Sequence, residues 1–282
     1  MKSLRFNFIK LNLVLATCLY SCTKENAENG SKNMSLSSEQ KVEVPDMQSD
    51  ARYNTFYGPA VQMGNGHIRS WININHNGQP LAVGAEITDG ALSNLPHDVE
   101  SFSEVSFILP FHQKVKQLPA YDHMEIDWNE HGHEPPGIYD LPHFDFHFYM
   151  ITVQEQMAIP PYEVAPALFD NLPSQEYLPA LYFRGPGGVP QMGVHWVDLL
   201  SPEFSGQTFT STFLYGTYDG RVTFHEPMVT MAVIQSGEKI EKEIRQPELY
   251  SPANRYYPTR YSVWKDDRTG KHYLSLDHMI LR

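Results

Sequence analysis

Cysteine is almost absent from this sequence. The chain of 282 residues contains two cysteines, Cys18 and Cys22, and both lie close to its start. The remainder offers no thiol, which excludes a disulfide-stapled fold, a cysteine nucleophile and a thiolate metal ligand in that part. A body of this length can nevertheless bury a core large enough to fold without crosslinks.

Positive charge is also scarce. Lys and Arg number 21 against 33 Asp and Glu, which gives a formal net charge of -12. Nucleic acids and anionic lipid surfaces are bound through basic surface, so this balance argues against either as a partner. The glycine-rich stretch at residues 184–190 lacks the Lys-Ser/Thr that a phosphate-binding loop needs, and no Ser-His-Asp motif occurs.

A long hydrophobic run is missing as well. The apolar stretch at residues 11–19 is too short to span a bilayer, which takes about 20 apolar residues. Lys2, Arg5 and Lys10 precede it without any acidic residue. A basic head followed by a short apolar stretch is typical of a secretory signal.

The end of this signal resembles the lipobox of bacterial lipoproteins. Leu19 lies three residues before Cys22 and the small Ser21 lies directly before it, although Tyr20 is bulkier than the usual occupant. The pattern predicts cleavage before Cys22, acyl chains on Cys22, and a place in the cell envelope, anchored on the exported side of the outer or plasma membrane. The alternative is an ordinary secretory signal with a chance cysteine.

Three segments follow from this reading. Residues 1–21 are the predicted lipoprotein signal peptide. Residues 22–50 are polar, without an aromatic residue or an apolar period, and cannot bury enough surface to offset their ordering entropy. We therefore expect a flexible tether there. Residues 51–282 contain no repeat and no internal linker, so we expect one β-rich domain.

Short strands dominate the expected secondary structure. Residues 66–76 alternate between apolar and polar side chains, Asn77-Gly78 is a strong hairpin signal, and residues 80–87 form the return strand. Further strands are expected at residues 105–111 (near a sheet edge, because of Pro110), 143–153, 209–217, 221–229, 261–265 and 271–280.

Helical signals are few. One or two turns are expected within residues 151–158 and 165–171, and a charged helix is expected at residues 237–245, ended by Pro247. We therefore predict a mainly β fold, α+β at most: an antiparallel sandwich or jelly-roll-like body with a few short helices.

Five of the thirteen histidines fall between His123 and His147. On a strand, side chains at i, i+2 and i+4 share a face. His143, Asp145 and His147 would then form a row on one face, about 6.5 to 7 Å apart per step, while the intervening phenylalanines pack into the core. Imidazoles and carboxylates that lean inward can bind one ion at about 2.0 to 2.2 Å.

The remaining ligands must come from other segments. His133 and Glu134 lie in a tight loop just upstream of the row, and His195 is the best candidate further along the chain. We predict His133, Glu134, His143, His147 and His195 as metal ligands. His225 and Glu226 alternate in direction, so at most one of them can face a shared site.

Imidazole and carboxylate without thiolate suit one divalent transition metal, namely Zn, Cu, Mn, Ni or Fe. Two alternatives are a pH-sensitive or purely structural polar network and a chance cluster.

A long segment supports a family resemblance. The segments that carry it are residues 128–149, 64–71, 189–198, and 215–220 with 226–228. Through them the chain resembles a family of exported bacterial proteins, a domain of unknown function with a Thermus namesake. The resemblance covers about residues 56–235. It implies export and a β-rich fold, leaves room for a homo-oligomer, and argues against His225 as an essential ligand. It supplies no reaction.

Three function classes remain open. The first is a membrane-anchored protein that binds a transition metal. The second is a metal-dependent hydrolase or oxidoreductase, in which Glu134 or Asp145 would act as general base beside a metal-bound water. The third is a non-catalytic module for ligand binding or self-assembly, with the histidines as a structural network.

Overall fold

The computed structural model describes residues 41–45, 52–99 and 105–282. Residues Gln40–Arg282 belong to one compact unit. The predicted signal peptide, Cys22 and most of the predicted tether lie outside the described residues. Within the described part, no helix is both long enough and apolar enough to cross a bilayer.

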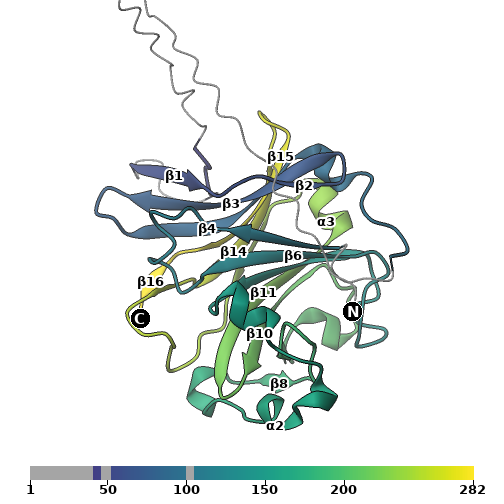
Figure 1. The fold of residues 1–282 in the computed structure, drawn as a ribbon. Helices are drawn as coiled ribbons and strands as arrows, with labels where there is room; N and C mark the ends of the chain where they lie inside the picture. The colour runs from purple at the N-terminus through teal and green to yellow at the C-terminus, as the bar shows by residue number, and fades with distance from the viewer. Residues whose placement is uncertain (1–40, 46–51, 100–104) are drawn as a thin grey trace, which may run out of the picture. The chain divides into compact units, whose positions relative to one another are not determined.

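The body is built from two large antiparallel sheets (Figure 1). The first, sheet A, has the order β1-β3-β4-β15-β14-β12, and β2 also pairs with β3. Its strands are β1 (Tyr53–Tyr57), β2 (Val61–Met63), β3 (Gly66–Asn75), β4 (Pro80–Ile87), β12 (Ile240–Glu243), β14 (Arg260–Asp266) and β15 (Lys271–Asp277).

The second sheet, sheet B, has the order β5-β6-β7-β11-β10-β9-β8. Its strands are β5 (Ser106–Pro110), β6 (His123–Asn129), β7 (His143–Tyr149), β8 (Tyr182–Arg184), β9 (Val194–Asp198), β10 (Ser211–Tyr218) and β11 (Arg221–Thr230). The strand with Pro110 lies at the sheet edge as expected, since proline has no backbone N–H to donate to a neighbouring strand.

Small elements complete the body. A two-stranded sheet pairs β13 (Tyr256–Tyr257) with β16 (Ile280–Leu281). The helices are α1 (Val153–Met157), α2 (Pro166–Phe169) and α3 (Met231–Ser236), and the 3₁₀ turns are η1 (Asp89–Leu92), η3 (Tyr162–Val164), η4 (Gln175–Tyr177) and η5 (Pro202–Ser205). The predicted mainly β, sandwich-like fold is confirmed.

The main core lies between the two sheets. Ile68 and Ile72 of β3 and Val83 of β4 belong to the same buried cluster as Phe144 and Phe146 of β7. All five side chains are fully buried. Each of these strands alternates, so the side chains between these positions stand on the outer faces of the sandwich.

The predicted helix at residues 237–245 is wrong. Instead, α3 ends at Ser236, Gly237 takes a left-handed conformation, and Ile240–Glu243 forms strand β12 on the edge of sheet A. Ile240 and Ile244 are four residues apart, a spacing that fits both one helix face and one strand face. Pairing with β14, which places Ile240 opposite Val263, selects the strand.

Residues 41–45, which fall inside the predicted tether, pack on the outer face of sheet A. Val42 and Val44 are buried against Trp71 and Trp264. The Val42 carbonyl accepts hydrogen bonds from the Tyr53 hydroxyl and from an Asn73 amide, both at 2.9 Å. Because of these contacts, the folded body begins before residue 51, the boundary predicted from the sequence.

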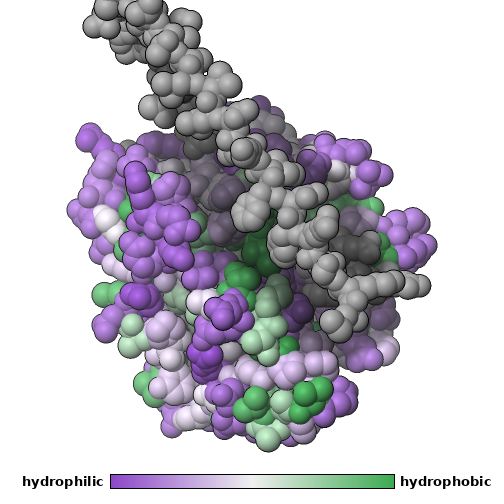
Figure 2. Space-filling model, in the orientation of Figure 1, coloured by the Kyte–Doolittle hydropathy of each residue, from purple (hydrophilic) through white to green (hydrophobic). Residues whose placement is uncertain are grey.

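Exposed apolar side chains gather in the segment between β7 and β10. Val164, Leu181 and Phe183 are among the most exposed of them. Figure 2 shows hydrophobic atoms at the lower end of the body, where Figure 1 places α2 and β8.

Candidate metal centre

The outer face of sheet B carries the histidine row. Phe144, Phe146 and Phe148 point into the core, and His143, Asp145 and His147 point outward, as the alternation predicts. Strand pairing enlarges the row, because Glu125 of β6 lies opposite His147, and Asp127 lies opposite Asp145. These two neighbouring strands therefore bring three carboxylates beside two imidazoles.

Most of this polar face is buried, although His133 and His195 are partly exposed. His143, His147, Asp127 and Glu226 are all buried to within about one per cent of full burial. Apolar clusters cover the same side of the sheet, built around Tyr149 and Phe224 at one end and around residues such as Tyr139, Phe209 and Met228 at the other. Charges buried in this way need compensation by an opposite charge.

The first group consists of His133, His143 and Asp145, whose candidate ligand atoms lie within 4.8 Å of one another. His143 Nε2 is 3.1 Å from Asp145 Oδ1, and His133 Nε2 is 3.3 Å from Asp145 Oδ2. The Asn129 amide donates to Asp145 Oδ2 at 2.8 Å. His133 comes from the loop that bridges back to Tyr139, while the other two come from β7.

The second group consists of His147, His195 and Glu226, also within 4.8 Å. His147 Nε2 is 3.6 Å from Glu226 Oε1, and His195 Nε2 is 3.4 Å from Glu226 Oε2. On the other side of the His147 ring, Nδ1 lies 2.9 Å from Asp127 Oδ2. These residues come from four strands, β7, β9, β11 and β6.

A hydrogen-bonded chain adjoins the second group. His123 Nε2 donates to Gln156 Oε1 at 2.8 Å, and Gln156 Nε2 donates to both carboxylate oxygens of Glu125 at 3.0 Å. Gln156 belongs to α1, whose start is fixed by a capping box between Thr152 and Glu155. Helix α1 therefore ties Glu125 in place.

The electrostatics of both groups favour cations. Burial works to lower the pKa of His133, but the hydrogen bond and charge of Asp145 raise it to about 9. Burial also works to lower the pKa of His147, yet Glu226 and Asp127 raise it to about 10. Burial raises the pKa of Glu226 to about 8. Burial, aided by the charge of His147, lowers the pKa of His195 to about 3. The carboxylates thus stabilise positive charge on His133 and His147.

Four of the five predicted ligands belong to these groups, but they divide between two centres instead of converging on one. His133 and His143 lie in the first, and His147 and His195 in the second. Glu134 is exposed and lies in neither group; its backbone carbonyl accepts a hydrogen bond from His133 Nδ1 at 2.7 Å.

Two carboxylate members were absent from the predicted ligands. Asp145 stands in the predicted row, so its signal is the strand alternation itself. Glu226 shows no local sequence signal beyond its alternation with His225. The His225 ring points away from the site, and its Nδ1 shares a hydrogen bond with the Tyr121 hydroxyl at 2.6 Å. Only the pairing of β11 with β7 brings Glu226 beside His147.

A third group is exposed. His97, Asp98 and Glu130 bring candidate ligand atoms within 4.8 Å of one another on the surface, and His131 Nε2 lies 3.2 Å from Asp98 Oδ1. Exposed charges of this kind are solvated and screened, so they contribute little to stability.

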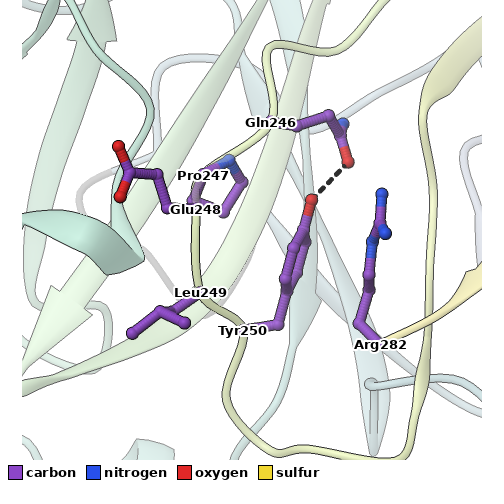
Figure 3. A pocket seen from close by; sticks show the side chains of 6 residues that line it. All are labelled: Gln246, Pro247, Glu248, Leu249, Tyr250 and Arg282. Atoms are coloured by element: carbon purple, nitrogen blue, oxygen red, sulfur yellow. Dashed lines mark hydrogen bonds between the residues drawn. The ribbon is translucent and has the colours of Figure 1, made fainter.

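An open cavity of about 370 Å³ lies elsewhere, lined by Gln246, Pro247, Glu248, Leu249, Tyr250 and Arg282. Figure 3 shows Tyr250 between Gln246, whose side-chain oxygen accepts its hydroxyl at 2.8 Å, and Arg282. None of the residues of the three histidine groups lines this cavity.

Comparison with models of protein families, with curated proteins and with solved structures yields no match. The function is therefore argued from the geometry of the site.

Proposed function

We propose that this protein is an exported, lipid-anchored protein that binds a divalent transition metal through His133, His143 and Asp145. The observation that carries the proposal is the direction of the two imidazole rings. His143 Nδ1 lies 2.6 Å from the Leu141 carbonyl, and His133 Nδ1 lies 2.7 Å from the Glu134 carbonyl. A carbonyl oxygen only accepts, so each Nδ1 must carry a hydrogen and donate it.

In a neutral imidazole, the other nitrogen then carries a lone pair and no hydrogen. Both lone pairs face oxygens of the same carboxylate, that of Asp145, at 3.1 and 3.3 Å. Acceptor atoms repel at such distances unless a cation lies between them. That cation is either a proton on each ring or a metal ion. One divalent ion serves both rings at once, whereas two protons leave two imidazolium rings 4.7 Å apart, centroid to centroid.

The outer contacts of the rings support the same conclusion. Histidines that bind metal usually donate their second nitrogen to a backbone carbonyl or a carboxylate, which fixes the tautomer and the ring direction. Both His133 and His143 have such a partner. The ligand set, two imidazoles and one carboxylate, suits Zn, Cu, Mn, Ni or Fe.

The place of the protein is part of the proposal. The residues before Cys22 support export and acylation of that cysteine, and the resemblance to exported bacterial proteins agrees with it. Cys22→Ser should abolish incorporation of labelled palmitate and release the mature chain from the membrane fraction. Labelled palmitate on the Cys22→Ser chain would contradict the anchor but not the metal site.

The metal site is tested by elemental analysis of the mature protein purified without chelator. We expect His143→Gln with Asp145→Asn to lose one transition-metal ion per chain. His225→Gln is the matched control, because His225 is equally buried in sheet B but points into the core. An unchanged metal content in the double variant, or loss in the control alone, would overturn the assignment.

A second candidate function has one observation in its favour. Three protein ligands leave a coordination position open, which is the arrangement of catalytic metal sites, and two histidines with one carboxylate is the ligand set of non-heme iron oxygenases. A metal-dependent hydrolase or oxidoreductase would then act on small molecules that can enter a buried site. Metal-dependent turnover that is lost in the same double variant would support it.

A further inference from the structure

We propose that the outer face of sheet B holds a second, separate divalent metal ion at His147, His195 and Glu226, and that Asp127 is the positioning residue of this site. The inference rests on the proposed function, because the ion is of the same class. It adds a second site and names the residue that orients its ligand.

The geometry of the group is that of a three-ligand site. Glu226 presents one oxygen to His147 at 3.6 Å and the other to His195 at 3.4 Å, both to Nε2 atoms. His195 is paired across the sheet with Gly216 of β10, which has no side chain of its own, and the Phe224 ring packs over that glycine. The Phe224 ring walls the group, with its centroid 4.9 Å from that of His147 and 5.2 Å from that of His195.

Buried polar atoms at this group have no hydrogen-bond partner. They include Nε2 of His147 and Oε2 of Glu226. His147 and Asp127 are fully buried, and Glu226 is nearly so. Unsatisfied buried polar groups are rare in folded proteins and need an explanation. A metal ion among Nε2 of His147, Nε2 of His195 and Glu226 satisfies the atoms that face it.

Buried carboxylates are concentrated on this face. Glu125, Asp127, Asp145 and Glu226 are four buried carboxylates. Within the described part of the chain, the ion-pair partners of these carboxylates are histidines alone. A divalent ion at each group would compensate the carboxylates that face it.

Asp127 acts on the ion through His147. Its Oδ2 lies 2.9 Å from Nδ1, on the side of the ring opposite Glu226. A carboxylate behind a metal-binding histidine fixes the ring direction and raises its basicity. In the first group, the backbone carbonyls that accept from His133 and His143 fix the ring directions in the same way.

The two ions would occupy separate sites. The groups share no ligand, and their members on β7, Asp145 and His147, are two residues apart, which is about 6.5 to 7 Å along a strand. Metal ions that share a bridging ligand lie about 3.5 to 4 Å apart. We therefore expect each group to keep its ion when the other is disrupted.

The test counts ions in the mature protein after saturation with Zn²⁺ or with Co²⁺ and removal of unbound metal. The intact protein should hold two ions at these groups, Glu226→Gln one, Asp145→Asn one, and the double variant none. His195→Gln should also hold one, and it keeps the test valid if Glu226→Gln does not fold, because His195 is partly exposed on β9. The variant His97→Gln is included throughout to remove the exposed group from the count.

Each outcome decides between the proposals. No bound ion in the intact protein would overturn the proposed function and this inference together. One ion, lost in Asp145→Asn and kept in Glu226→Gln, would overturn this inference alone. Two ions that both survive Glu226→Gln would place the second site elsewhere.

The role of Asp127 has a separate readout. We expect Asp127→Asn to lower the affinity for the second ion about 10- to 100-fold and to change the absorption spectrum of Co²⁺ bound there, while the affinity for the first ion stays the same. Glu125→Gln is the matched control, since it removes a buried negative charge that also lies beside His147 but is hydrogen-bonded to Gln156 and not to the imidazole. Equal weakening of both ions, or equal weakening in Glu125→Gln, would contradict a positioning role.

Discussion

The outer faces of the two sheets both bury carboxylates, but they satisfy them in different ways. On sheet A, Asp277 accepts hydrogen bonds from Arg260 at 2.7 Å, Ser262 at 2.8 Å and Ser275 at 2.7 Å. On sheet B, Asp127 and Glu226 face imidazoles, and Oε2 of Glu226 has no hydrogen-bond partner.

Glu86 repeats the pattern of sheet A. It accepts hydrogen bonds from Arg69 at 2.9 Å, Lys271 at 3.0 Å and the Tyr273 hydroxyl at 3.1 Å. A network with permanent cations and hydroxyl donors is complete within the chain and acts as structure. A network of carboxylates with imidazoles is complete only when a proton or a metal ion is added. The comparison separates a structural polar face from one built to bind.

The largest effect is expected on the structural face. Asp277→Ala removes the nearer of the two carboxylates that pair with the buried guanidinium of Arg260 and leaves only Glu241 at 3.4 Å. It should lower the free energy of unfolding by about 3 kcal/mol. Denaturant unfolding of the metal-loaded variant measures this change. The number of bound metal ions should stay as in the intact protein, and a loss of metal would break the distinction between the faces.

Metal removal should act on the other face. With free metal at 100 times its dissociation constant, binding adds about 2.7 kcal/mol per site to the stability, and excess chelator removes it. Unfolding curves with and without chelator give the difference. The increment should persist in Asp277→Ala and shrink in Asp145→Asn. If chelator leaves the unfolding curve unchanged, the polar face of sheet B is structural, like that of sheet A.

Two glycines allow a matched comparison of the faces. A Cβ at Gly216 would lie 2.0 Å from the Phe224 ring, and a Cβ at Gly84 of sheet A would lie 2.0 Å from the Leu274 carbonyl oxygen. We expect Gly216→Ala and Gly84→Ala each to cost about 1 to 3 kcal/mol, because a packed core must move to accept the methyl group. Only Gly216→Ala should lose the ion at His195, which elemental analysis would detect.

The exposed histidine group should give the smallest effect. His97→Gln is expected to change the free energy of unfolding by less than about 0.5 kcal/mol, because its partners Asp98 and Glu130 stay solvated. Thermal unfolding measures this change. The two buried ions should be unaffected. A stability loss comparable to that of Asp277→Ala would show that burial does not separate the groups.

Local chemistry made much of the fold predictable. Asn77-Gly78 joins β3 to β4 at the predicted turn, with Gly78 in a left-handed conformation. The helix prediction at residues 237–245 failed because an apolar spacing of four residues fits either period, and a partner strand decided between them. Where the sequence pattern has a single period, as in residues 143–148, local and tertiary preferences agree.

The candidate site was predictable only in part. The row on β7 follows from alternation, and the nearness of His133 follows from a short loop. The division into two groups does not, because it depends on which strands flank β7. Glu125 and Asp127 arrive from β6 on one side, and Glu226 from β11 on the other. Sequence separation hides such partners, since Glu226 is far along the chain from His147.

The sequence by itself determined which side chains share a strand face, because the pleat alternates whatever lies next to it. It also determined that thiolates take no part in the body and that negative charge is in excess. Only the tertiary structure decided which face is sealed, which strands are neighbours and which carboxylate stands before each imidazole. Those choices depend on the burial of apolar surface across the whole sandwich, and no single segment contains that information.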